Sequence, residues 1–214
     1  MDEEITIIDT NTRNERIKNF FINNKKNLIV GTLILLIIMI GYFSFEEMKD
    51  QKKIKLANQY NLTTVSYKNE EKKKTVDELT NLVNVHDATY SPLALYFLID
   101  NNLIDNKKKI NILFDELIDK TDLEEEIKNL IIYKKALFNS DFSLENDLLK
   151  ILSPIINSDS IWKSHSLYLM GEYFYSNNEK EKAKEFFNKV LLLANANKEI
   201  KIESEKRIKR DFSE

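Results

Sequence analysis

The chain has 214 residues with three glycines, two prolines and no cysteine, and its formal net charge is -3. So little glycine and proline argues against a β-sandwich or barrel, which needs these residues at its many turns. The absence of cysteine excludes disulfides, thiolate catalysis and cysteine-based metal sites. Acidic and basic residues are mixed along the chain, so no basic face predicts a nucleic-acid partner.

Positions 1–27 form a tail that is acidic at its tip and basic towards its end. The stretch Arg13–Asn27 also carries four large apolar residues, namely Ile17, Phe20, Phe21 and Ile22. Two interpretations remain open for it. The stretch lies as an amphipathic helix on the inner leaflet, or it is the start of a membrane helix.

The next segment, Leu28–Phe45, contains no charged residue. At a rise of 1.5 Å per residue it spans about 27 Å as a helix, close to the thickness of the hydrocarbon core. A buried core helix is rarely apolar on all sides over this length. A cleaved signal peptide has a shorter apolar region nearer the start and a small-residue cleavage site. We therefore expect a retained, single-pass transmembrane helix over 28–45.

The charges beside this segment predict its orientation. Lys25 and Lys26 precede it, and Glu46 and Glu47 follow it. By the positive-inside rule, the tail is cytoplasmic and the remainder lies on the periplasmic side of a bacterial inner membrane.

Residues 46–214 alternate helical apolar patterns with short polar breaks, which predicts a domain of helix pairs. Asn, Asp, Ser and Lys at the breaks are typical of helix ends. The expected breaks are Lys68–Lys74, Asn84–Asp87, Asn101–Lys107, Lys120–Asp122, Asn139–Ser143, Asn157–Ser160, Ser176–Glu179 and Asn195–Lys198. The expected fold class is all-α, with an N-terminal transmembrane helix followed by a TPR-like α-hairpin solenoid.

The clearest repeat lies in Trp162–Val190. Gly171, Phe174, Ala183, Phe187 and Val190 have the mutual spacings of the tetratricopeptide consensus. Small residues at 171 and 183 allow two antiparallel helices to approach closely, and the aromatic residues fill the space between neighbouring pairs.

Earlier repeats precede it at steps close to the tetratricopeptide period of about 34 residues. Their expected positions are Ala136 with Leu148, Leu152 and Ile155; Leu98 with Ile110, Phe114 and Leu117; and Thr64 with Tyr67, Val76 and Val83. Two further features concern the ends of helices. Pro154 should kink or shorten its helix, and the highly charged Lys198–Phe212 is expected to be a solvated capping helix.

No arrangement of residues indicates chemistry. The two histidines, His86 and His165, have no partner at metal-ligand spacing, and the sequence contains neither HExxH, GxGxxG nor a P-loop. We expect no catalytic, cofactor-binding or metal-binding residue, and therefore no enzyme.

The layout and two segments resemble a known bacterial family. Thr89–Leu95 and Trp162–Val190, together with a short tail, one span and a clearest repeat that comes last, are similar to the YfgM-like ancillary subunit family of the SecYEG translocon. The resemblance implies a TPR domain on the periplasmic side that holds periplasmic chaperones near emerging polypeptides. It implies no catalytic residue. A different envelope scaffold, in cell division or envelope assembly, is the alternative function.

The first helix of each pair lines the concave face of such an array, where partners bind. In the two clearest repeats these positions are Leu130, Tyr133, Leu137, His165, Tyr168, Glu172 and Tyr175. Tyrosines are large and amphipathic and suit peptide contacts. Their rings could instead pack against the next helix pair. If they bind a partner, replacing Tyr133, Tyr168 and Tyr175 together weakens its capture.

Overall fold

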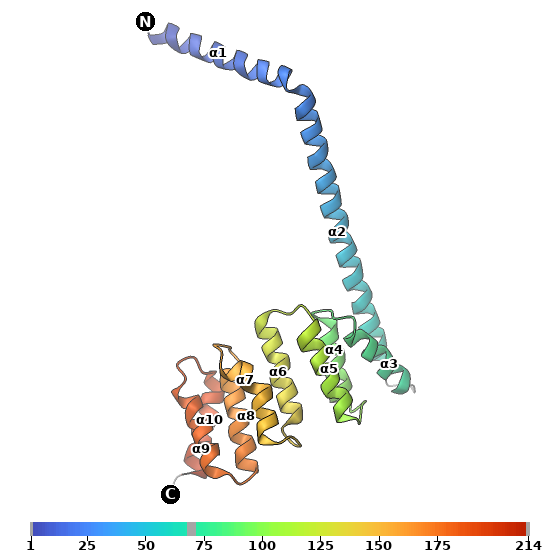
Figure 1. Ribbon diagram of the computed structural model, residues 1–214, viewed down its shortest axis with the longest axis vertical. Helices are drawn as coiled ribbons and strands as arrows, with labels where there is room; N and C mark the ends of the chain where they lie inside the picture. The colour runs from blue at the N-terminus through green and yellow to red at the C-terminus, as the bar shows by residue number, and fades with distance from the viewer. Residues whose placement is uncertain (1, 68–71, 213–214) are drawn as a thin grey trace. The chain divides into compact units, whose positions relative to one another are not determined.

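The computed structural model describes residues 2–67 and 72–212, and within them it contains ten α-helices and no strand (Figure 1). The expected all-α class is confirmed. The helices are α1 (Asp2–Asn23), α2 (Lys25–Ser66), α3 (Lys72–Val83), α4 (Tyr90–Asp100), α5 (Lys107–Lys120), α6 (Glu125–Asn139), α7 (Glu145–Ile156), α8 (Lys163–Ser176), α9 (Lys180–Leu192) and α10 (Lys198–Asp211).

The chain divides into two compact units, Met1–Lys55 and Leu56–Glu214. The first contains α1 and most of α2. The second begins inside α2, where Leu56 is buried in the helical core at 6% exposure. Leu56–Glu214 is called the helical unit below.

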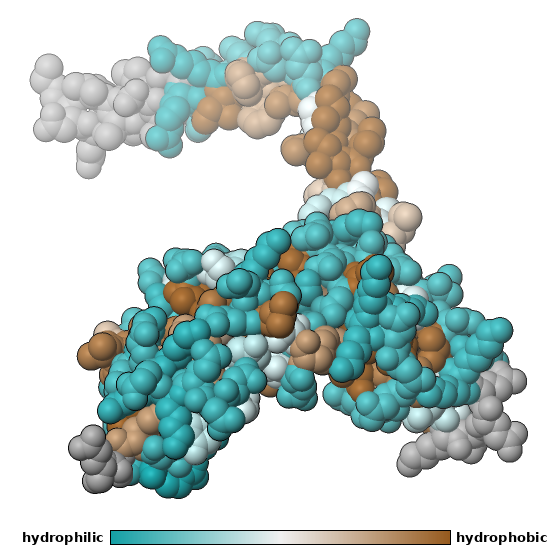
Figure 2. Space-filling view, turned by 60° about the horizontal axis from the view of Figure 1, so that its bottom comes forward, coloured by the Kyte–Doolittle hydropathy of each residue, from teal (hydrophilic) through white to brown (hydrophobic). Residues whose placement is uncertain are grey.

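Within the described residues, α2 is the one helix long and apolar enough to cross a membrane. The large apolar side chains of Leu28–Phe45 are 37% to 68% exposed. Figure 2 shows this apolar stretch as a continuous brown surface. A core helix would bury these side chains in protein, so that alternative does not hold, and soluble surfaces rarely expose apolar patches of this size. The helix then continues unbroken to Ser66.

The breaks between the helices of the helical unit fall where the polar clusters predict them, although most of the first, 68–74, lies outside the described residues. Asparagine takes the place that glycine often has at these ends. Asn102 and Asn178 adopt left-handed φ angles of 49° and 63°. Beside Asn178, the Glu179 amide donates to the Phe174 carbonyl over 2.9 Å and closes a Schellman motif. Asparagine tolerates this conformation, so the chain ends helices with few glycines.

The helix pairs of the repeats pack as the spacing predicts. Gly171 of α8 lies against Phe187 of α9 so closely that a Cβ on Gly171 would be 2.6 Å from Phe187 Cε1. Ala183, Phe187 and Val190 are fully buried. The expected residues of the two preceding repeats are also buried: Leu98, Ile110, Phe114, Leu117, Ala136, Leu148, Leu152 and Ile155. In the pair formed by α6 and α7, α7 ends at Ile156, two residues after Pro154.

The first repeat is only partly as expected: Val83 is fully buried and Tyr67 and Val76 pack against the same core, but Thr64 is not the buried residue of α2. Thr64 is only partly buried, and its hydroxyl donates to the Tyr60 carbonyl of its own helix. Thr63 is buried instead, and its hydroxyl donates to Glu78 of α3 over 2.7 Å. From Thr63, the later spacings lead to the buried residues Thr75, Leu79 and Leu82. Adjacent threonines at 63 and 64 cannot be distinguished by residue type alone.

The helical unit contains two hydrophobic cores that meet at α6. Ile131 belongs to the core formed by α2 to α5, and the next residue, Ile132, belongs to the core formed with α7, α8 and α9. Ile118 of α5 packs against both cores. Asn111 and Asn139 exchange amide hydrogen bonds of 2.9 and 2.8 Å, which fix α5 against α6. α6 therefore contributes to both cores of the helical unit.

Candidate functional site

The seven predicted binding residues lie on α6 and α8, which pack against each other. Leu130, Tyr133 and Leu137 are on α6. The four on α8 are His165, Tyr168, Glu172 and Tyr175. Tyr133 of α6 and His165 of α8 are in contact. The other residues of α8 and α6 face different parts of the helical unit.

Two of the α8 residues, Glu172 and Tyr175, contact the C-terminal helix α10 and the residue after it, Phe212. The Arg207 guanidinium donates to both carboxylate oxygens of Glu172, with Nε at 2.6 Å from Oε1. The same guanidinium lies 4.9 Å from the centroid of the Tyr175 ring, a cation–π contact. The Phe212 ring lies 5.9 Å from that of Tyr175. Glu172 and Tyr175 therefore help to hold α10 in place.

Tyr168 also faces this contact. Its ring lies 5.4 Å from Phe187, and burial is the main cause that raises the pKa of the Tyr168 hydroxyl. The charge-rich α10 is thus more than a solvated cap: Ile208 and Phe212 pack against the second core, and Ser204 is fully buried.

An aromatic cluster joins α6 to the start of α8. The Tyr133 and Trp162 rings are stacked with centroids 5.7 Å apart, and His165 lies 5.0 Å from Trp162. The indole N–H of Trp162 donates to the Glu126 carbonyl over 3.1 Å. Burial lowers the pKa of His165, which keeps the imidazole neutral in this cluster. These contacts fix α6 against α8.

The open part of the surface lies near the C-terminal end of α6. Leu130 is half-buried, whereas Leu137 is 48% exposed. Leu137 lines a hollow of about 190 Å³ between α4, α5 and α6, called the α4–α6 hollow below. Its other lining residues are Tyr96, Ile99, Asp100, Phe114, Lys134 and Phe138.

The step from one helix pair to the next is longest between α5 and α6. The last repeat position of the pair before the hollow is Leu117, and the first position of the following pair is Ala136. The step from Leu117 to Ala136 is three positions longer than the two equivalent steps. These run from Leu82 to Leu98 and from Ile155 to Gly171. The α4–α6 hollow lies beside Leu137, whereas α8 packs on α6.

Polar groups at the hollow are suited to hold a partner. Lys134 Nζ lies 4.6 Å from the centroid of the Tyr96 ring, and Asp100 is exposed at the rim. The Tyr96 hydroxyl is buried and has no hydrogen-bond partner among the described residues. Burial raises the pKa of this hydroxyl, which has almost no exposed surface.

Sequence reasoning missed most of this lining, although one signal was present. Ile99 stands directly after Leu98, as Leu137 stands after Ala136 and Glu172 after Gly171. The same repeat register therefore places Ile99 on the binding face. Tyr96 and Lys134 lie between the expected positions, and only the packing of α4 beside α6 reveals them.

The described residues offer little for catalysis. No group of three or more His, Asp or Glu side chains in residues 2–67 and 72–212 is arranged to hold a metal ion. His86 contacts Glu116 at 3.2 Å, and Glu116 also pairs with Lys120 at 2.8 Å. Glu116 and Lys120 lie on α5, and His86 approaches them from the connection between α3 and α4. The α4–α6 hollow, in contrast, offers a space for an apolar group of a partner beside Lys134 and Asp100.

Comparisons with known proteins give one relevant relative. A protein named ancillary SecYEG translocon subunit, from Buchnera aphidicola subsp. Acyrthosiphon pisum (strain APS), is 27% identical over 186 residues, which cover 83% of this chain and 92% of the relative. The helical unit makes up about three quarters of the chain, so a match of that extent also includes part of the apolar stretch of α2. The likeness therefore includes part of the apolar stretch and most of the helical unit. No protein-family model and no solved structure matches the chain.

Proposed function

We propose that this protein is a non-catalytic, membrane-anchored scaffold that binds other proteins at the Sec translocon. The observation that carries the proposal is the extent of the likeness to a protein named for the SecYEG translocon, which includes part of the apolar stretch as well as the helix pairs. An accessory subunit needs both parts. The anchor keeps it beside a membrane complex, and the helix pairs supply a surface for partners.

The helical unit acts on the periplasmic side of the inner membrane in this proposal. Lys25 and Lys26 lie before the apolar stretch, separated from it only by Asn27. Glu46 and Glu47 directly follow the stretch. Basic residues at one end favour retention of that end in the cytoplasm. There the unit would hold periplasmic chaperones near polypeptides that emerge from the translocon.

The α4–α6 hollow is the proposed contact point. Leu137 is exposed in it, while the four predicted residues of α8 contact α9, α10 or the aromatic cluster. A hollow of about 190 Å³ is smaller than typical drug-sized pockets. It suits one apolar side chain of a partner, with Lys134 and Asp100 at its polar rim.

Site-specific crosslinking in native membranes tests the function. A photo-crosslinking residue at Leu137 is expected to capture translocon subunits or periplasmic chaperones. The matched control is Leu144, which is 75% exposed at the start of α7 and lines no part of the α4–α6 hollow. Capture of division or peptidoglycan proteins from Leu137 would instead support an envelope scaffold and overturn the translocon role.

A pull-down tests the contact point. Leu137→Asp places a charge in the hollow and is expected to reduce partner capture at least tenfold, whereas Leu144→Asp leaves capture unchanged. Because both side chains are exposed, both variants should keep the helicity of the parent. Equal capture by the two variants would reject the hollow as the contact point.

A further inference from the structure

The junction of α1 and α2 forms an elbow that the proposed scaffold role does not use. α1 ends at Asn23 and α2 begins at Lys25. Asn24 keeps backbone contact on both sides, because its amide donates to the Phe20 carbonyl over 3.0 Å and its carbonyl accepts from the Leu28 amide over 2.9 Å. The helical hydrogen bonding therefore continues through the bend, and the residues on either side keep a defined spacing.

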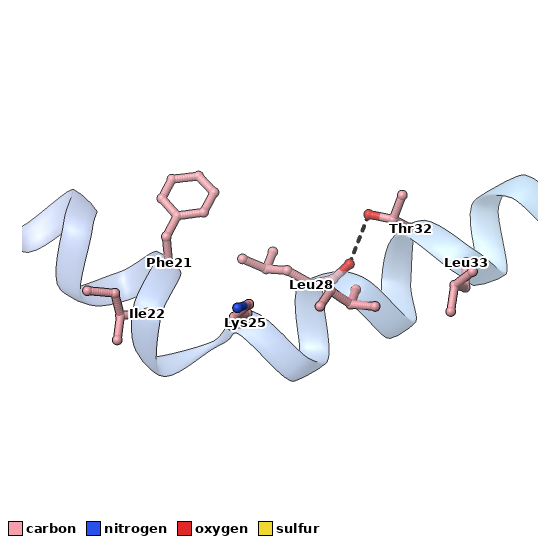
Figure 3. Close-up of a pocket in the computed structure, with 7 residues that line it drawn as sticks. Phe21, Ile22, Lys25, Leu28, Thr32 and Leu33 are labelled. Carbon is pink, nitrogen blue, oxygen red and sulfur yellow. Dashed lines mark hydrogen bonds between the residues drawn. The ribbon is translucent and has the colours of Figure 1, made fainter.

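The inner side of the elbow is an apolar hollow of about 670 Å³, called the elbow hollow below. Figure 3 shows Lys25 at the bend, between Phe21 and Ile22 of α1 and Leu28 of α2. The remaining lining residues, Ile29, Thr32 and Leu33, belong to the apolar stretch itself. The hydroxyl of Thr32 donates to the Leu28 carbonyl over 2.9 Å, so it adds no free polar group. Only the lysine brings a charge to this surface.

An apolar stripe extends from the elbow along α1. Ile17, Phe20 and Phe21 have the spacing i, i+3 and i+4, which places them on one side of the helix. Their side chains are 50%, 56% and 57% exposed. The stripe is continuous with the hollow through Phe21. An apolar surface that joins a membrane-spanning stretch is positioned to enter the same bilayer.

Basic side chains accompany this stripe. Residues 13–27 carry Arg13, Arg16, Lys18, Lys25 and Lys26 against one acid, Glu15. No ion pair between any of these basic residues and another described residue is present. Long basic side chains extend along apolar surface and keep their charges in the headgroup region. The stripe is therefore complementary in charge to an anionic lipid surface.

We propose that the elbow binds an anionic phospholipid of the adjoining leaflet. An acyl chain packs in the elbow hollow against Phe21, Leu28 and Ile29, and the phosphate is held by Lys25 with Lys26 beside it. The stripe on α1 then lies in the plane of that leaflet. Charge complementarity and continuity with the membrane span select a lipid as the occupant in preference to a second protein.

The absence of cysteine allows a direct test with the full chain. Single cysteines at Phe21→Cys and Asn19→Cys carry an environment-sensitive fluorophore. Positions 19 and 21 differ by about 200° around the helix, so they lie on nearly opposite sides. The chain is placed in nanodiscs of two parts phosphatidylcholine to one part phosphatidylglycerol. Lipids with a nitroxide near the headgroup should quench the label at 21 at least threefold more than the label at 19.

The lipid dependence and the lysines complete the test. Quenching at position 21 should fall at least twofold in pure phosphatidylcholine. Lys25→Gln with Lys26→Gln should remove that dependence on phosphatidylglycerol, because each basic residue contributes roughly a fivefold preference for an anionic surface. The matched pair Lys52→Gln with Lys53→Gln, farther along α2, should preserve it.

Ile17→Cys serves as a second label on the stripe, so that a local effect of replacing Phe21 does not decide the result. Equal quenching on both sides of the helix would overturn the proposal. So would quenching at 17 and 21 that is the same with and without phosphatidylglycerol, or that the control pair reduces as much as Lys25→Gln with Lys26→Gln. None of these results depends on whether the helical unit binds the translocon.

Discussion

The contact between Gly171 and Phe187 makes a sharp prediction about stability. Gly171→Ala adds one methyl group where the nearest atoms of the Phe187 ring would lie 2.6, 2.8 and 3.0 Å away. Phe187 is fully buried, so other side chains surround its ring. The added methyl group must therefore displace either the ring or α8. Overpacking of this kind costs about 1–3 kcal/mol.

An opposing effect lowers the net cost. Alanine is favoured over glycine inside a helix by about 1 kcal/mol. We therefore expect Gly171→Ala to reduce the free energy of unfolding by about 1 kcal/mol, and Tm by about 2–4 °C for a unit of this size. Urea unfolding can be followed by far-UV circular dichroism and by the fluorescence of Trp162, the one tryptophan of the chain.

A second variant shows whether the ring is the cause. Phe187→Leu removes ring atoms and on its own should cost about 1–3 kcal/mol. When Gly171→Ala is combined with it, the added methyl enters the space that the ring leaves. The double variant should therefore be more stable than the two separate costs predict, by about 0.5 kcal/mol or more. Simple additivity, or a Gly171→Ala protein as stable as the parent, would refute the close packing of α8 on α9.

Two further predictions concern α10. Arg207→Ala removes the partly buried ion pair with Glu172 and should lower the free energy of unfolding by about 1–2 kcal/mol and speed proteolysis of α10; the exposed control Lys206→Ala should change neither, and an equal effect of both would contradict the contact. Arg210, followed by Arg207, lowers the pKa of Asp211 from 3.8 to about 2. Between these two pKa values the folded state keeps the Asp211 carboxylate ionised, whereas the unfolded state protonates it. The contribution of Asp211 to the free energy of unfolding is therefore complete above pH 4 and is lost as the pH falls towards 2. Protection factors for hydrogen exchange in α10, which correct for the effect of pH on the chemical exchange rate, should therefore fall over that range in the parent and not in Asp211→Asn.

Local sequence pattern was enough to predict the elements of this protein. The uncharged stretch Leu28–Phe45, the polar breaks and the repeat positions at Leu98, Ala136 and Gly171 depend on composition and on helical periodicity. Both are properties of neighbouring residues. Within the described residues the breaks after α3 and these repeat positions agree with the structure, because a helix buries residues at the same spacing wherever it packs.

Tertiary packing alone decided which part of the predicted surface is open. Tyr168, Glu172 and Tyr175 have the residue types of a binding face, yet α10 returns over them with Arg207 and Phe212. Leu137, in contrast, lines the α4–α6 hollow and remains 48% exposed. Periodicity shows which side of a helix faces away from its partner, but contacts between residues more than thirty positions apart determine what covers that side.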